Sequence, residues 1–187
     1  MVNKGYISSK VGKKALTEDQ ARRLLEYCTD LMEKTLLELA LNTGIRRRDI
    51  INIKRSNIDF VNKKLTFYEH KKDRFFTIPL NQKLLNSLEI WIKVAPKSKW
   101  LFPSKRGGHI SSKTAYNILQ RNLKRAGLPQ RPFHALRATC IKLCQKRGWT
   151  PEQVSELTGD LISTIQQHYL TPSEEEMKKI VEEKPLL

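Results

Sequence analysis

Residues 133–148, FHALRATCIKLCQKRG, are the stretch on which the prediction of the fold depends. The pattern predicts a helix that ends at Gly148. His134 and Arg137 stand three positions apart, so their side chains share one face of that helix, while Leu136 faces the core. An imidazole and a guanidinium side by side suit one phosphate held by two donors. A lone His-x-x-Arg pair is common, however, so its meaning depends on the rest of the chain.

The composition favours a partner that is a polyanion. The chain has 187 residues, is 39% hydrophobic, and carries a formal net charge of +16 with a pI near 9.9. Its length suits one domain, or one domain with a short appendage. Such a charge fits DNA, RNA or an acidic membrane surface. No apolar run approaches the roughly 20 residues of a membrane span, and the first residues lack the apolar stretch of a secretion signal.

Three cysteines, an odd number without paired spacing, argue against a disulfide framework. We expect them to be reduced, partly buried core residues. Together with the charge, they predict a protein of the cytoplasm that is associated with DNA, in the nucleoid or wherever the DNA lies.

The periodicity predicts a class that is α+β and mostly α. Helices are expected at about 18–27, 31–41, 47–53, 81–94, 112–125, 133–147, 151–157 and 163–169, and another begins near 174. Residues 58–60, 65–68 and 75–78 predict a small three-stranded antiparallel sheet. The helix at 81–94 is predicted from the apolar residues Leu84, Leu85, Leu88, Ile90 and Trp91, and residues 100–102 are expected to be buried. Residues 1–14 are interpreted as a basic arm or linker, 15–170 as the domain and 171–187 as a tail helix.

Other parts of the chain carry the residue types that attack on a phosphodiester requires. Arg46 follows Thr43-Gly44, where a buried helix is predicted to end, and arginine is the best fixed cation for phosphate oxygens. Asp49, three residues on, could hold an arginine by a salt bridge or form an ordinary surface pair. Lys71 lies in the loop between two predicted strands, where it is either a DNA-reaching cation or part of a charged turn.

The order of these elements resembles the catalytic domain of the tyrosine recombinases, the phage integrase family. Thr-Gly-x-Arg at 43–46, a hairpin lysine, His-x-x-Arg at 134–137, and Gly159 followed ten positions later by Tyr169 carry the resemblance. It covers about residues 15–170. The resemblance also includes three stretches that are not catalytic, at 100–103, 107–108 and 150–153.

The resemblance assigns the catalytic residues: Arg46, Lys71, His134, Arg137 and Tyr169, the nucleophile. Lys71 fits the family's spacing to Pro79 better than Lys72, which remains an alternative. Asp49 falls where the family has an acidic residue that supports the arginines. Seven positions are candidates for DNA contacts: Arg47, Lys72, Arg106, Arg121, Lys124, Arg125 and Arg131.

The implied function is site-specific DNA recombination or integration, as in a mobile element, through a 3′-phosphotyrosine intermediate. The implied partners are double-stranded DNA and further copies of the chain, as a dimer or tetramer on DNA. No cofactor or metal is expected, because the phosphate bond energy is kept in the covalent link. In the family a tail like 171–187 packs on a neighbouring protomer, whereas the alternative here is a frayed terminus.

Two features depart from the family. Asp160 stands where the family has His or sometimes Trp; it is expected to point toward a basic side chain, because a carboxylate repels a phosphate. His168 is a poor substitute, since it lies about 100° round the helix from Tyr169. Little precedes residue 15, whereas most members carry a helical core-binding domain there, so the chain is either a catalytic fragment or a short member.

Three rival functions remain open. A catalytically weak or inactive DNA-binding protein of the same fold would explain Asp160. A type IB topoisomerase would share the chemistry but relax DNA in place. A metal-dependent nuclease could use Asp49, Asp73 and Asp160, but their surroundings are basic and their spacing is not that of a metal site.

Overall fold

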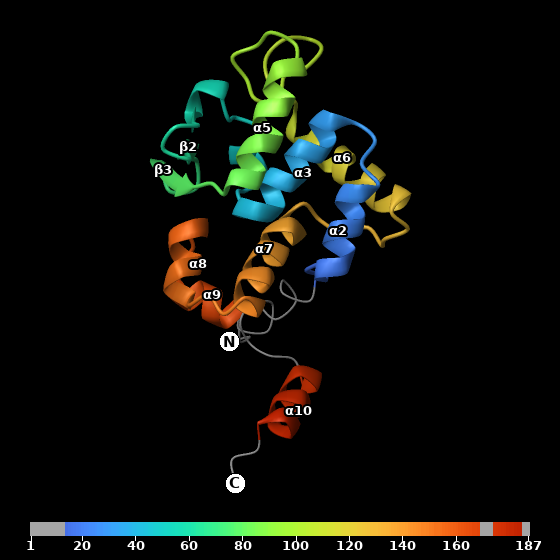
Figure 1. Cartoon of the computed structure of the whole chain (residues 1–187), viewed down its shortest axis with the longest axis vertical. Coiled ribbons are helices and arrows are strands. Elements are labelled where there is room, and N and C mark those ends of the chain that lie inside the picture. The colour runs from blue at the N-terminus through green and yellow to red at the C-terminus, as the bar shows by residue number, and fades with distance from the viewer. Residues whose placement is uncertain (1–13, 169–173, 185–187) are drawn as a thin grey trace, which may run out of the picture.

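The fold of the computed structural model is a body of helices with a small sheet at one side (Figure 1). The structure describes residues 14–168 and 174–184. Its helices are α2 (Glu18–Glu26), α3 (Leu31–Thr43), α4 (Arg47–Ile50), α5 (Gln82–Val94), α6 (Ser112–Arg125), α7 (His134–Lys146), α8 (Pro151–Thr158), α9 (Ile162–His168) and α10 (Glu174–Glu183), with a 3-10 turn η2 (Arg55–Asn57). The predicted class, mostly α with a small sheet, is confirmed.

The sheet is antiparallel, with strand order β1-β2-β3. Its strands are β1 (Ile58–Asp59), β2 (Lys64–Glu69) and β3 (Arg74–Pro79). Leu65 pairs with Ile78, and both are fully buried. Two positions further along each strand, Phe67 opposes Phe76. Because alternate residues of a strand share a face, the next inward position on β2 is Glu69, at the end of the hairpin nearest the candidate site.

Helix α3 forms the centre of the helical body and packs against both α5 and α7 (Figure 1). Its N-cap is Asp30, whose Oδ1 accepts a hydrogen bond from the backbone N–H of Glu33 at 3.0 Å. It ends at Gly44, which adopts the left-handed conformation with φ of +65°. The C-terminus of α3 therefore stops at a defined place beside the N-terminal turn of α7.

Two capping boxes are present at the starts of helices. Thr17 Oγ1 accepts from Gln20 N at 3.2 Å, and the Gln20 side chain accepts from Thr17 N at 3.1 Å. Thr150 and Gln153 make the same reciprocal pair at 3.3 and 2.9 Å. The second box begins α8, which ends at Gly159, another left-handed glycine.

Several expectations about the fold need correction. Ile90 is 55% exposed, because the apolar stripe of α5 follows Leu84, Leu88 and Trp91 and leaves Ile90 on the opposite side. Trp100 is half-buried, although the two residues after it are fully buried. The helix expected at 47–53 ends at 50. Residues 1–13, 169–173 and 185–187, and so most of the predicted basic arm, lie outside the described residues.

Across residues 14–168 and 174–184, no helix is both long and apolar enough to cross a membrane.

Candidate active site

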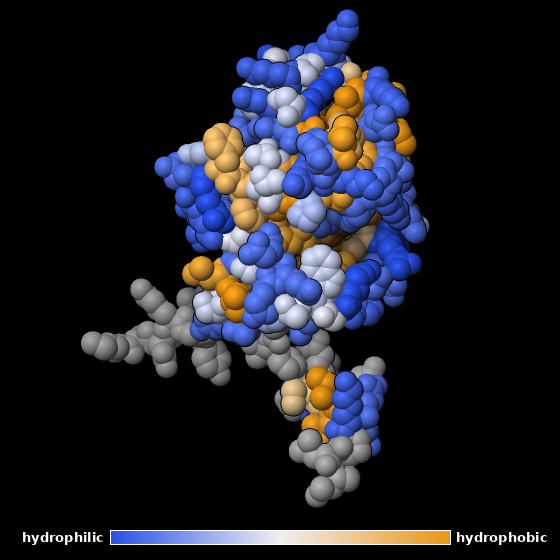
Figure 2. Space-filling model, turned by 60° about the vertical axis from the view of Figure 1, so that its left-hand side comes forward, coloured by the Kyte–Doolittle hydropathy of each residue, from blue (hydrophilic) through white to orange (hydrophobic). Residues whose placement is uncertain are grey.

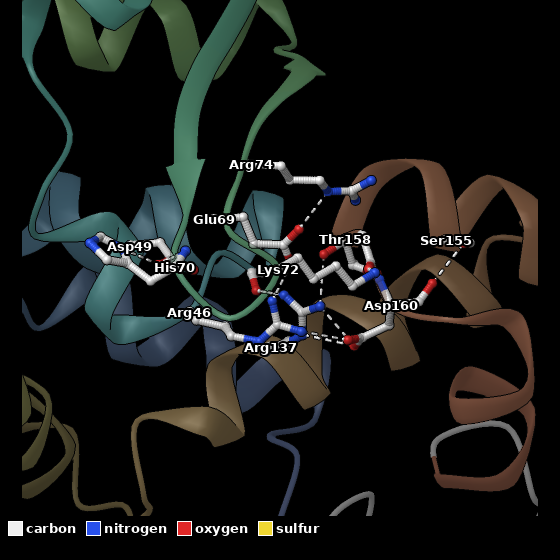
Figure 3. Close-up of polar contacts among 12 residues, drawn as sticks. Arg46, Asp49, Glu69, His70, Lys72, Arg74, Arg137, Ser155, Thr158 and Asp160 are labelled. Atoms are coloured by element: carbon white, nitrogen blue, oxygen red, sulfur yellow. Dashed lines mark hydrogen bonds and ion pairs between the residues drawn. The ribbon is translucent and has the colours of Figure 1, made fainter.

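Arg137 is the centre of the candidate site. It lies in the first turn of α7 and is 3% exposed. Its Nη1 donates to the carbonyl of Gly44 at 2.6 Å, and its Nη2 donates to the carbonyl of Thr158 at 2.7 Å. These carbonyls are the C-terminal ends of α3 and α8, where the helix dipole is negative. Two helix ends thus hold one buried guanidinium (Figure 3).

Glycines 44 and 159 lie where these elements approach each other. A Cβ on Gly44 would lie 3.4 Å from Arg137 Cγ and 3.4 Å from Thr158 Cγ2. A Cβ on Gly159, whose φ is +71°, would lie 3.3 Å from the ring of Phe76. Both positions also have a left-handed backbone that glycine adopts without strain.

Arg46 is the N-cap residue of α4, directly after the turn that ends α3. Its Nη2 donates to Asp160 Oδ1 at 2.7 Å, and its Nη1 donates to Glu69. Glu69 is 1% exposed and also accepts from Arg74 Nε at 3.1 Å. The hairpin therefore brings a buried carboxylate to Arg46.

Asp160 joins the two arginines (Figure 3). Its Oδ1 accepts from Arg46, and its Oδ2 accepts from Arg137 Nε at 2.9 Å and lies 2.7 Å from Arg137 Nη2. The backbone carbonyl of Asp160 accepts from Ser155 Oγ at 2.7 Å. The expectation that this carboxylate points toward a basic side chain is confirmed, and it engages two. We call this contact of Asp160 with Arg46 and Arg137 the Asp160 bridge.

Neither partner considered for Asp49, an arginine or an ordinary surface pair, is found. Asp49 is 2% exposed, so it is not a surface pair, and no arginine of the described residues contacts its carboxylate. Its Oδ1 instead accepts from the backbone N–H of His70 at 3.1 Å and lies 2.8 Å from His70 Nδ1. Asp49 therefore fixes the start of the hairpin turn, and Glu69 and Asp160 support the arginines in its place.

Lys71 and Lys72 both lie in the turn between β2 and β3. Lys72 Nζ donates to the carbonyl of Gly159, so this lysine ties the hairpin to the end of α8. Lys71 is exposed and forms no ion pair within the described part of the chain. Its charge is near enough to contribute to the lowered pKa of His134.

His134 begins α7, one turn before Arg137. His134 is exposed as a residue, but its ring is partly buried. This burial lowers the pKa of His134 below its usual 6.5, and the charge of Arg137 lowers that pKa further. The charges of Arg46 and Lys71 act in the same direction, whereas Asp160 opposes them. The imidazole is therefore neutral at pH 7.

Arg46, His134 and Arg137 line one pocket of about 290 Å³. Its other lining residues are Ile45, Arg47, Tyr116, Pro132 and Phe133. A second cavity, of about 990 Å³, lies between α2, α3, α7 and α8, and none of the residues assigned a catalytic role lines it. The smaller pocket is the candidate site, because the cations gather there. Tyr169, the predicted nucleophile, lies outside the described residues, directly after the last residue of α9.

The predicted DNA contacts fall into two groups. Arg121 and Arg125 pair with Glu33, a buried carboxylate of α3 that also accepts from Asn122 at 2.7 Å. These two arginines therefore hold α6 to α3. The remaining positions form no ion pair with any residue that the structure describes: Arg47, Lys72, Arg106, Lys124 and Arg131.

Sequence reasoning missed Glu69. A signal was available, because β2 alternates inward Leu65 and Phe67 and the next inward position is Glu69. A charged residue at an inward position of a strand needs a cation, and Arg46 supplies it. No group of three or more His, Cys, Asp or Glu side chains suited to a metal ion is found where the structure is described.

Comparison with known proteins identifies the family. The family model described as "Phage integrase family" matches residues 14–176, so this chain belongs to that family. More particularly, this chain is a tyrosine recombinase catalytic domain.

Three relatives illustrate the likeness. The tyrosine recombinase XerA of Pyrococcus horikoshii is 26% identical over 178 residues, which cover 93% of this chain and 62% of the relative. The crystal structure of a XerA recombinase matches with a TM-score of 0.77 at 21% identity, over 92% of this chain and 66% of the other. A XerH recombinase bound to its difH substrate matches with a TM-score of 0.72 at 19% identity, over 90% and 53%. The chain thus spans less than two thirds of each.

Proposed function

We propose that this chain is the catalytic domain of a site-specific DNA recombinase that cleaves and rejoins strands through a 3′-phosphotyrosine link at Tyr169. The observation that carries the proposal is the shared pocket of Arg46, His134 and Arg137, which come from distant parts of the chain. Two guanidiniums and a neutral imidazole suit the non-bridging oxygens of a phosphodiester in its transition state.

In the proposed reaction, the Tyr169 phenol releases its proton to water, its oxygen attacks phosphorus in line, and the bond to the 5′ oxygen breaks. Arg46 and Arg137 stabilise the negative charge on the equatorial oxygens. His134, neutral at pH 7, donates one hydrogen bond to the same phosphoryl group. A 5′-hydroxyl of another strand then attacks the phosphotyrosine, so the total number of phosphoester bonds stays constant.

The leaving 5′ oxygen needs a proton, and we assign its donor as Lys71. Lys72 is already bonded to the Gly159 carbonyl and positions the turn. Both lysines are exposed, but Lys71 forms no ion pair within the described part of the chain. A lysine on a turn held at both ends can reach the leaving group without moving the sheet.

Duplex DNA is the proposed substrate. The net charge of +16 suits a polyanion, and the structurally similar XerH recombinase is bound to a difH substrate. Cations near the pocket would hold the backbone phosphates, among them Arg47 in its wall and Lys71, whose charge acts on His134.

We further propose that α10 packs on a neighbouring copy of the chain. Its Met177, Ile180 and Val181 are exposed, at spacings that place them on one side of the helix. Figure 2 shows this apolar side next to a polar one. The larger cavity, with apolar walls that include Leu25 and Leu143, is the proposed receptor on the neighbour.

Covalent trapping on nicked suicide DNA tests the proposed activity. The wild-type chain should form an adduct that survives SDS, and Tyr169→Phe should form none. The matched control is Tyr27→Phe, which alters an exposed tyrosine at the end of α2 and should trap as well as wild type. An adduct that persists in Tyr169→Phe would refute the assignment of the nucleophile.

A DNA-binding protein without cleavage activity is the second candidate. The Asp160 bridge favours it, because a carboxylate already occupies both arginines. Specific DNA binding by the wild type, with no adduct at any concentration, would support this candidate over the recombinase.

A further inference from the structure

The hydrogen-bonding capacity of Arg137 is almost used up within the protein. A guanidinium has five N–H groups. Nη1 bonds to the Gly44 carbonyl, and Nη2 bonds to the Thr158 carbonyl. Nε and Nη2 both lie within hydrogen-bond distance of Asp160 Oδ2, at 2.9 and 2.7 Å. Only one N–H, on Nη1, has neither a hydrogen bond nor the Asp160 carboxylate close to it.

A phosphate needs more than this from Arg137. Arginine holds phosphate best through two parallel N–H groups along one edge of the fork. The edge formed by Nε and Nη2 is the one that Asp160 occupies. In the arrangement described, Arg137 therefore cannot hold a phosphate by two bonds.

Arg46 faces the same carboxylate. Its Nη2 bonds to Asp160 Oδ1, while its Nη1 bonds to Glu69. Each oxygen of Asp160 thus takes one arginine, as two non-bridging oxygens of a phosphate would. Asp160 is not part of the pocket lining, whereas both arginines are. Asp160 therefore engages N–H groups of both arginines from outside that lining.

From these contacts we propose that Asp160 is an internal competitor for the phosphate: the Asp160 bridge neutralises Arg46 and Arg137 in the free protein, and it must open before the scissile phosphate binds. The inference rests on the proposed function and adds a regulation of the same site. DNA binding then supplies the free energy that separates the carboxylate from the arginines. Cleavage without correctly placed DNA is suppressed.

The contacts of Glu69 supply an internal comparison. Glu69 is also a buried carboxylate that accepts a hydrogen bond from Arg46, but it forms no hydrogen bond or ion pair with Arg137. Removing its charge leaves the Arg137 edge occupied by Asp160. Only a change at Asp160 releases both arginines at once.

The first test measures affinity for inorganic phosphate by calorimetry, independently of cleavage. Asp160→Asn should bind phosphate at least about tenfold more tightly than wild type, because an ionic competitor of two charge-assisted hydrogen bonds is removed. Glu69→Gln should change the affinity much less, and Asp19→Asn, an exposed change on α2, should leave it unchanged. Weaker binding by Asp160→Asn would overturn the proposal, since it would mean that Asp160 orients the arginines for the ligand.

The second test measures the rate of adduct formation on nicked suicide DNA. Asp160→Asn and Asp160→His should both trap faster than wild type. If the wild type traps and both variants are slower, the competitor role fails while the proposed function stands. If none of the three traps, the proposed function fails, and the phosphate titration still decides the role of Asp160.

A measurement on the wild type covers the case in which the variants do not fold. A crystal structure with phosphate bound in the pocket should show the Arg137 Nε to Asp160 Oδ2 distance lengthened from 2.9 Å to beyond hydrogen-bond range. Phosphate bound with that contact intact would overturn the proposal.

Discussion

At the scale of single residues, Arg137 is the point at which distant parts of the chain meet. The ends of α3 and α8 and the carboxylate of Asp160 all bond to it. Its side chain is buried, so none of these acceptors has water as a ready replacement. Arg137 is thus a structural residue as well as a proposed catalytic one, and its two roles can be measured separately.

Replacing Arg137 by Met should destabilise the fold by about 3–5 kcal/mol, the usual effect of removing one partner of a buried ion pair. Urea unfolding followed by circular dichroism measures this change. Arg106→Met, at an exposed turn position, is the matched control and should change the free energy of unfolding by less than about 0.5 kcal/mol. Equal effects of the two substitutions would contradict the described contacts of Arg137.

The lowered pKa of His134 predicts a pH dependence of stability. Its pKa in the folded protein lies below its usual 6.5, so the unfolded chain takes up a proton first as the pH falls. The contribution of a neutral His134 is complete above about pH 6.5 and is lost as the pH falls below that value. His134→Gln should therefore lose less thermal stability than wild type between pH 7.5 and 5.5. Parallel melting curves for the two proteins over this window would contradict the assignment.

At the scale of elements, the site is built where helices end. Left-handed glycines stop α3 and α8, and the carbonyls exposed there receive Arg137 and Lys72. Such helix ends can be predicted from the sequence, because glycine after an apolar helix is a strong stop signal. The end of α3 at Gly44 was accordingly predicted from the sequence.

Substitution of Gly44 by Ala separates backbone strain from packing. Gly148, with φ of +78° and no atom within 4 Å of the place that a methyl group would take, is the matched control. Both changes should cost about 1–2 kcal/mol for the left-handed backbone. Gly44→Ala should in addition slow adduct formation on suicide DNA, because the new methyl group presses on Arg137 Cγ. Equal trapping rates for the two variants would show that this contact does not position the arginine.

The partners of the charged residues could not be predicted in the same way. The spacing of Asp49 left open an arginine or an ordinary surface pair as its partner, and its carboxylate instead contacts His70. Glu69 and Asp160 meet at Arg46 although they are far apart in the chain. Sequence spacing reports neighbours on one helix, whereas contacts between elements depend on how the helices and the hairpin pack.

At the scale of the whole molecule, α10 carries three apolar side chains that are exposed in the described part of the chain: Met177, Ile180 and Val181. Ile180→Glu places a charge in the middle of its exposed apolar side. Because the helix is proposed to pack on a neighbouring copy, this variant should bind a single half-site normally but fail to form the larger complex on a full site. Native gels with half-site and full-site DNA measure both. Asn86→Glu, at an exposed position of α5, is the control.

A full-site complex of Ile180→Glu that matches wild type would leave α10 without a role in assembly. Loss of half-site binding would instead mean that α10 supports the domain itself.

The central claim is that Arg46, His134 and Arg137 converge on one phosphate beside Tyr169. A crystal structure of Tyr169→Phe bound to duplex DNA tests it most directly. We predict the scissile phosphate in the pocket of about 290 Å³, with its oxygens about 3 Å from nitrogen atoms of all three residues and the substituted aromatic ring beside it. A phosphate backbone that passes over another surface and leaves this pocket empty would contradict the account.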